Sequence, residues 1–231
     1  MNFRKRRDPR WWLGNATFAP RYGWKVTDVA DFKKTEAAYS AKRGEIRILD
    51  VPDMQFLMID GHGDPNTSQE YADALAALYP VAYKLKFASK RELGRDYVVM
   101  PLEGLWWADD MSAFTSSRDK ALWDWTMMTM IPAWIDHEIF DLVAKQVAAK
   151  DPPVSIGKLR LATLAEGRAV QTLHLGSYDD EGPVLAQIHD DFIPSHGLRM
   201  VGKHHEIYFS DARRVAPEKL RTILRQPVAT A

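Results

Sequence analysis

Residues 204–210 combine a carboxylate and a phenol at a spacing that could do chemistry. Alternate side chains of an extended strand share a face, so Glu206 and Tyr208 point together while Ile207 and Phe209 point to the opposite side. This pattern indicates a strand with the core on one side and a pocket on the other. Because exposed glutamates are common, a surface Glu206 on a half-exposed strand is the alternative that the spacing leaves open.

A second carboxylate lies among aromatic residues in the segment 101–107. In a regular strand Glu103 and Trp107 share one side, and Trp106 lies on the other. An overlay of the two halves of the chain aligns Glu103 with Glu206. We therefore expect the two carboxylates to converge on one cleft.

The sequence also has eight tryptophans and eight tyrosines, whose flat apolar rings serve a core or a ligand pocket equally well. Trp123, Trp125 and Met127 share one face of a further predicted strand. Any one of these rings is more often a core residue, but together they exceed what a core of this size requires. Some of them are predicted to line a cavity.

Metal and nucleophile chemistry have little support in the sequence. His204 and His205 diverge on a strand, and no His-Glu-x-x-His spacing occurs, so no metal or other cofactor is expected. The scattered histidines leave open a metal site formed only in space. There is no Gly-x-Ser-x-Gly elbow, phosphate-binding glycine loop or dinucleotide fingerprint. With no cysteine, disulfide and iron–sulfur chemistry are excluded.

Composition narrows the class of protein further. The 231 residues include 31 basic and 31 acidic ones, so the chain has no net positive charge. It therefore lacks the overall positive electrostatic field that attracts nucleic acid. The basic run Arg4-Lys5-Arg6-Arg7 is interpreted as a solubilising terminus rather than a nucleic-acid arm. No apolar stretch is long enough to span a membrane, and no secretory signal is present. We expect a cytoplasmic protein, a monomer or homodimer, with no direct nucleic-acid or membrane partner.

The hydrophobic pattern predicts an irregular leader over residues 1–44, with one short helix, and a folded region over 45–228. Strands are predicted at 46–50, 55–60, 97–108, 121–131, 158–164, 169–175, 205–210 and 220–224. Helices are predicted at 67–89, with Thr67 and Glu70 as a capping box, after Asp136, and from Pro183 to Gly197.

The order strand–strand–helix–strand–strand thus occurs twice, in halves at about 45–150 and 154–228, joined by a Pro-Pro connector. Two such halves packed with pseudo-two-fold symmetry leave a cleft between equivalent strands, and clefts of this kind are preferred ligand sites.

Several segments together resemble a known family. They include Ile59-Asp60-Gly61-His62-Gly63, Pro101-Leu102-Glu103-Gly104-Leu105-Trp106-Trp107, Tyr178-Asp179-Asp180-Glu181 and His204-His205-Glu206-Ile207-Tyr208. Over residues 45–228 the chain is similar to GyrI-like small-molecule-binding proteins, and more narrowly to stand-alone members without a DNA-binding domain. The resemblance implies an α+β fold of tandem strand–helix–strand–strand modules with pseudo-two-fold symmetry. It also implies an antiparallel sheet with helices on one side and a central ligand cleft.

The resemblance further implies an aromatic cage around a central glutamate. The glutamate of the family maps to Glu206, and its aromatic partners map to Tyr71, Trp106, Trp107, Trp125 and Tyr208. Some relatives bind bulky, often cationic, drugs, and some stand-alone members hydrolyse the strained cyclopropane of DNA-alkylating compounds.

The expected function is therefore binding of hydrophobic aromatic or cationic xenobiotics. A hydrolase activity with Glu206 and Tyr208 as catalytic residues is the extension of that function. Haem, tetrapyrrole or metal binding by a similar tandem fold is the alternative.

Overall fold

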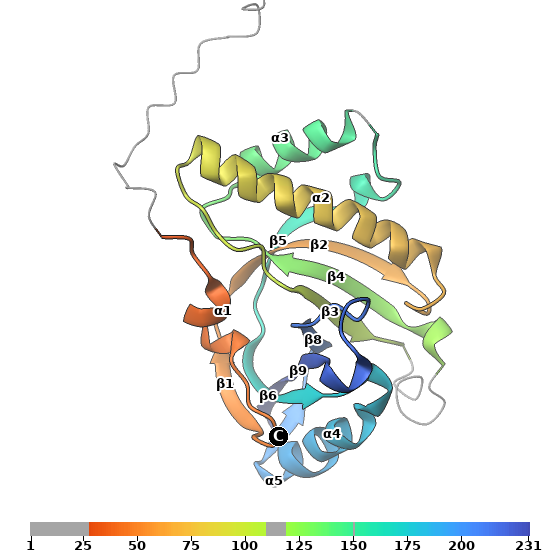
Figure 1. The fold of residues 1–231 in the computed structure, drawn as a ribbon. Helices are drawn as coiled ribbons and strands as arrows, with labels where there is room; N and C mark the ends of the chain where they lie inside the picture. Colours follow the sequence, from red (N-terminus) through yellow and green to blue (C-terminus); the bar gives the residue numbers. More distant parts are fainter. Residues whose placement is uncertain (1–27, 110–118, 150) are drawn as a thin grey trace, which may run out of the picture.

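The computed structural model describes residues 28–109, 119–149 and 151–231, and Figure 1 shows its fold. The basic run predicted to be a solubilising terminus lies outside these residues. The strands are β1 (Arg47–Val51), β2 (Met54–His62), β3 (Leu102–Trp107), β4 (Asp124–Met130), β5 (Arg160–Leu164), β6 (Gly167–Leu175), β7 (Leu198–Met200), β8 (His204–Tyr208) and β9 (Arg221–Thr230).

The nine strands of the described residues form one antiparallel sheet in the order β1-β6-β9-β8-β3-β4-β2-β5, with β7 paired to β9. The β8–β3 pair lies at the centre of this order with three strands on each side, which confirms the tandem α+β architecture. The two halves are not self-contained, because each contributes a strand to the other. Although only Pro52 and Asp53 separate β1 from β2, β1 pairs with β6 and β2 pairs with β5. The first strand of each half therefore completes the sheet of the other half.

The helices that follow β2 in the chain pack on one face of the sheet. They are α2 (Gln69–Glu92) and α3 (His137–Ala148) over the first half, and α4 (Gly182–Ala186), the π-helical turn η6 (Gln187–Phe192) and α5 (Ile193–Ser195) over the second (Figure 1). On this face Trp106, Trp125 and Met127 pack against the buried side of α2, and Leu224 packs with Ile188 of η6. We call it the helix face.

The start of α2 differs by one residue from the predicted cap. The hydroxyl of Ser68, not of Thr67, accepts the backbone N–H of Tyr71 at 3.4 Å. The N–H of Thr67 donates to the carbonyl of Asp64 in the preceding turn, and Glu70 accepts from the N–H of His62. The predicted cap of α3 is confirmed, because Asp136 accepts the N–H of Ile139 at 2.9 Å.

Two predicted strands begin later than expected, and one ends later. β3 begins only after Pro101, and β4 follows the 3-10 turn η3 (Lys120–Leu122). β9 continues to Thr230 because β6 pairs with it as far as Pro227 and β7 pairs with its last three residues. β7 is a short strand with two exposed residues, and it was not predicted. The remaining 3-10 turns are η4 (Ile156–Lys158), η5 (Tyr178–Asp180) and η7 (Pro217–Lys219).

The second face of the sheet packs against the segment before β1. This segment contains the single-turn helix α1 (Phe32–Thr35) and the 3-10 turn η1 (Ala37–Tyr39), where one short helix was predicted. Ala38 and Tyr39 are buried in the apolar cluster of this face. Arg225 of β9 donates to the carbonyl of Ala38 at 2.5 Å, and Gln171 of β6 donates to that of Ser40 at 2.8 Å. Part of the predicted leader is thus fixed to the sheet.

Candidate functional site

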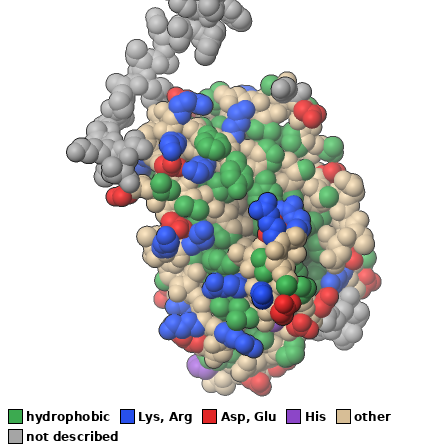
Figure 2. Space-filling view, in the orientation of Figure 1, with side chains coloured by type: hydrophobic (Ala, Val, Ile, Leu, Met, Phe, Trp, Pro, Cys, Tyr) green, Lys and Arg blue, Asp and Glu red, His purple; other side chains and the backbone are tan. Residues whose placement is uncertain are grey.

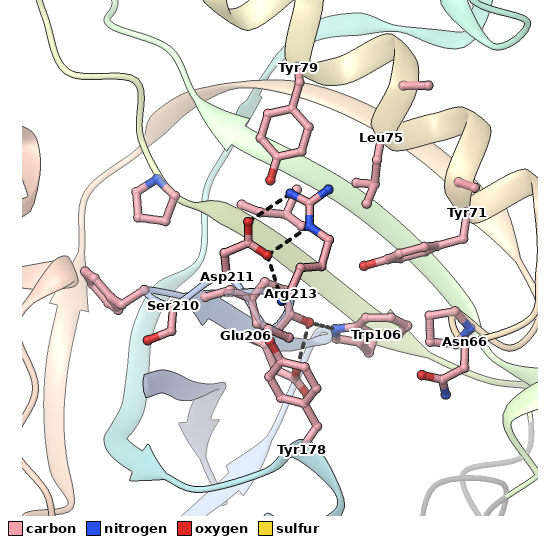
Figure 3. Close-up of a pocket in the computed structure, with 18 of the residues that line it drawn as sticks. Asn66, Tyr71, Leu75, Tyr79, Trp106, Tyr178, Glu206, Ser210, Asp211 and Arg213 are labelled. Carbon is pink, nitrogen blue, oxygen red and sulfur yellow. Dashed lines mark hydrogen bonds and ion pairs between the residues drawn. The ribbon is translucent and has the colours of Figure 1, made fainter. Parts of the chain in front are cut away.

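A pocket of about 990 Å³ opens on the helix face between α2, the central strands β3 and β8, and the loop that follows β8 (Figure 3). Eight aromatic side chains line it: Tyr71, Tyr79, Tyr83, Trp106, Trp123, Tyr178, Tyr208 and Phe209. A space of this size surrounded by rings fits a bulky organic molecule.

Glu206 is held in this pocket by its strand and by a chain of hydrogen bonds. The Tyr208 hydroxyl donates to Oε2 of Glu206 at 2.7 Å, and Nε1 of Trp106 donates to the Tyr208 oxygen at 2.9 Å. The two strand residues point together because they alternate with buried Ile207, as the spacing predicted. The carboxylate is therefore fixed in orientation by aromatic donors.

Gly104, which pairs with Glu206 across the β3–β8 ladder, makes room for this chain. A β-carbon at Gly104 would lie 2.7 Å from Nε1 of Trp106 and 3.1 Å from the Tyr208 oxygen. Any larger residue would displace the indole or the phenol. A glycine here is required by close packing, not by backbone conformation.

The phenols around Glu206 stay protonated over the working pH range. Burial, with the nearby Glu206 charge adding to it, raises the pKa of Tyr178 to about 12 and that of Tyr208 well above its usual value. Burial is also the main reason that the pKa of Tyr71 is raised. These side chains are hydrogen-bond donors and neutral rings, and they do not act as bases.

Charged residues lie at the mouth of the pocket, in the loop after β8. Asp211 binds the guanidinium of Arg213 through both carboxylate oxygens, each at 2.9 Å, beside Tyr79 of α2 (Figure 3). These contacts hold the pKa of Asp211 at about 2. Figure 2 shows Lys and Arg side chains spread over the visible face, with Asp and Glu side chains among them.

The structure brings four of the predicted site residues together and places one behind them. Tyr71, Trp106, Glu206 and Tyr208 line the pocket. Trp125 is fully buried and meets the Tyr71 ring edge-on, with ring centroids 5.3 Å apart. Trp125 therefore supports a wall of the pocket from within the core.

Glu103 and Trp107 do not line the pocket, which corrects the prediction that the two carboxylates converge. In the β3–β8 ladder Glu206 pairs with Gly104, whereas Glu103 pairs with Ile207. Paired residues of antiparallel strands share a face, so Glu103 and Glu206 lie on opposite faces of the sheet. The overlay of the two halves was wrong by one residue, and a shift of one residue exchanges the faces.

Glu103 instead belongs to a buried polar network on the second face. It accepts the Tyr39 hydroxyl at 2.7 Å, and its other oxygen lies 3.0 Å from Nε2 of His205. Nδ1 of His205 lies 2.9 Å from Glu166, which binds Arg225 at 2.7 Å. Burial alone would raise the pKa of Glu166, but His205 and Arg225 lower it to about 2. Paired charges of both signs explain why this network can be buried.

Sequence reasoning missed several pocket residues. Tyr178 and Glu181 come from η5 and its end, and Asp211 and Arg213 come from the loop after β8. Their segments carry no strand or helix periodicity that would assign a face. Tyr79 lies on α2, where its spacing of eight residues from Tyr71 was the available signal.

Metal or haem binding gains no support from the described residues. In residues 28–109, 119–149 and 151–231, no group of three His, Cys, Asp or Glu side chains is arranged to hold a metal ion. No histidine of the described part of the chain lines the large pocket.

None of the helices described combines the length and the apolar character needed to cross a bilayer.

A tandem sheet with an aromatic, carboxylate-bearing pocket between its halves defines a small-molecule-binding protein. Residues 44–229 match the model of the GyrI-like small molecule binding domain, and the chain belongs to the GyrI-like family.

Solved structures from Listeria innocua agree with this assignment. An uncharacterized conserved protein is 38% identical, with a TM-score of 0.79. Two proteins described as hydrolases are 36% and 35% identical, with TM-scores of 0.75 and 0.78. Each comparison covers 87% of this chain and 100% of the other. A search of curated proteins found no match.

Proposed function

We propose that the pocket binds bulky planar aromatic cations and thereby protects against xenobiotic compounds of this class. The observation that carries the proposal is the environment of Glu206. Its side chain is 15% exposed and bordered by rings, and among the described residues no Lys or Arg forms an ion pair with it. A bound cation would supply the missing positive charge.

Two attractions act on such a ligand. A cation about 4 Å from a carboxylate near a protein surface gains roughly 4 kcal/mol before its own desolvation is counted. Contact with the faces of Trp106 or Tyr71 adds about 1–2 kcal/mol, since aromatic rings attract cations. The first attraction requires the charge of Glu206, and the second does not.

The test is a fluorescence titration of wild type and Glu206→Gln with ethidium, a planar cation, and with neutral phenanthridine. We expect the substitution to weaken ethidium binding about 10- to 100-fold, or roughly 1.4–2.7 kcal/mol, and phenanthridine binding less than about threefold. Glu92→Gln, an exposed change of the same charge at the end of α2, is the matched control. Equal ethidium affinity in wild type and Glu206→Gln would refute the proposal.

A second function, hydrolysis of strained cyclopropane-containing electrophiles, is favoured by the Trp106–Tyr208–Glu206 chain of hydrogen bonds. A carboxylate fixed in this way can take a proton from water while the rings stabilise positive charge at the attacked carbon. The likeness to two Listeria innocua proteins described as hydrolases supports a hydrolytic activity of some kind.

Mass analysis of such a compound after incubation should show the gain of one water with wild type. With Glu206→Gln the rate should fall at least about a hundredfold, the usual contribution of a general base. Equal rates would remove Glu206 from the chemistry.

A further inference from the structure

His204 lies beside Glu206 on the helix face, two residues earlier on β8. Its Nε2 atom is 3.5 Å from Oε1 of Glu206, and the two side chains are 10% and 15% exposed. The other carboxylate oxygen, Oε2, receives the Tyr208 hydroxyl. Glu206 is therefore held between a phenol that faces the pocket and an imidazole that lies behind it.

Three ring nitrogens at this place have no hydrogen-bond partner among the described residues. They are Nδ1 and Nε2 of His204 and Nε2 of His189, and all three are buried. The His189 ring stands edge-on to that of His204, with centroids 6.0 Å apart. Buried polar atoms are nearly always paired, so an unpaired group beside a carboxylate points to a functional role.

The backbone around His189 is also unusual. It lies in η6, a π-helical turn between α4 and α5. Such wide turns are rare and occur often at functional sites, because they shift one side chain out of the regular helical position. Here the turn brings His189 over the residue that contacts Glu206.

The charged and titratable groups that face His204 are few. Glu206 comes from its own strand and His189 comes from η6, where Asp190 acts on the His189 ring. Its partner on β3 is Trp106, and the β9 partners of Glu206 and Tyr208 are the uncharged Leu224 and Thr222. Burial, with His204 adding to it, lowers the pKa of His189 to about 4. Of the two histidine rings, that of His204 lies within 3.5 Å of the Glu206 carboxylate, and the His189 ring packs against it from the other side.

We infer that His204 is a positioning residue that shares one proton with Glu206, so that a bound cation expels this proton from the pair. The inference rests on the proposed binding function and deepens it. With the proton present the pair is neutral and attracts a cation weakly. Without the proton the carboxylate carries its full charge.

The same pair can serve the hydrolysis. One O–H bond of water breaks, its oxygen bonds to the electrophilic carbon, and the strained carbon–carbon bond breaks toward the conjugated acceptor of the substrate. The proton from water passes through Glu206 to His204 and returns to that acceptor, so the net change is addition of one water.

The first experiment is calorimetric titration of wild type with ethidium at about pH 6.5, in two buffers of different ionisation enthalpy. The quaternary nitrogen of ethidium keeps its charge at every pH used. We expect the measured binding enthalpies in the two buffers to differ, because the buffer takes up the fraction of one proton that binding releases. Identical heats would overturn the inference, and this result does not depend on any variant folding.

The second experiment measures ethidium affinity between pH 8 and pH 5.5 in wild type, His204→Gln and His137→Gln. An ordinary histidine titration lowers affinity about tenfold one pH unit below its midpoint. We expect this loss in wild type and in His137→Gln, an exposed control at the start of α3. His204→Gln places a neutral amide beside Oε1 that does not titrate, so its affinity should change less than about threefold.

Parallel pH curves for wild type and His204→Gln would overturn the inference. Failure of the binding function gives a different result, because Glu206→Gln would then bind ethidium as tightly as wild type at pH 8.

Discussion

Replacing Tyr39 with phenylalanine removes a single hydroxyl from the buried face of the sheet. That hydroxyl donates to Oε1 of Glu103 at 2.7 Å, and the two residues are 4% and 0% exposed. Oε2 of Glu103 keeps His205, so the variant leaves one buried oxygen without its partner. A hydrogen bond to a charged group contributes about 1.5–3 kcal/mol, and we expect Tyr39→Phe to lower the free energy of unfolding by about 2 kcal/mol.

The assay is urea unfolding followed by tryptophan fluorescence, supported by thermal unfolding. For a chain of this size, ~2 kcal/mol corresponds to a fall in the midpoint temperature of about 4–8 °C. Tyr83→Phe is the matched control, because Tyr83 is 51% exposed and such surface changes stay within about 0.5 kcal/mol. If the two variants are equally stable, Tyr39 does not anchor its segment and the reasoning is wrong.

Two further changes test the two faces of the sheet. Gly104→Ala should break the Trp106–Tyr208 hydrogen bond and weaken ethidium binding about tenfold in the fluorescence titration. The control Gly157→Ala, at an open position, should bind ethidium as wild type does. Equal affinities of the two variants would contradict the packing argument. Burial lowers the pKa of His205, but Glu166 and Glu103 together raise it, so its stabilising contribution is full below about pH 6.5 and is lost as pH rises through the raised pKa. Urea unfolding across pH 6–9 should show this loss in wild type and a flatter profile in His205→Gln, and parallel profiles would refute it.

Strand alternation was sufficient to orient the residues of β8. The apolar Ile207 and the polar neighbours on either side define two faces without any knowledge of the partner strands. The same rule separated Trp106 from Trp107 on β3, and the structure places Trp106 in the pocket and Trp107 on the other face. Local periodicity therefore determines a face wherever a strand is regular.

Register between distant strands could not be obtained in this way. The overlay of Glu103 on Glu206 matched residue types, but in the β3–β8 ladder Glu206 pairs with Gly104. This register depends on how Trp106 and Tyr208 pack above the glycine. The pairing of β1 with β6 likewise depends on contacts across the whole sheet. Such features arise from tertiary packing, which no short window of sequence contains.

The cap of α2 shows a smaller limit of the same kind. Thr67 and Ser68 are both good capping residues, and the turn at Asp64 decides between them by binding the N–H of Thr67. The role of Tyr39 depended on a partner 64 residues away in the chain. Its apolar neighbours alone gave no reason to place it next to a buried carboxylate.

The most direct test of the central claim is a crystal structure of the protein with ethidium bound. We predict that the planar ring system lies against Trp106 and Tyr71, with its quaternary nitrogen within about 6 Å of the Glu206 carboxylate, the range over which charge and ring faces attract a cation. Ethidium bound elsewhere on the molecule, with the pocket beside Glu206 unchanged, would contradict the account.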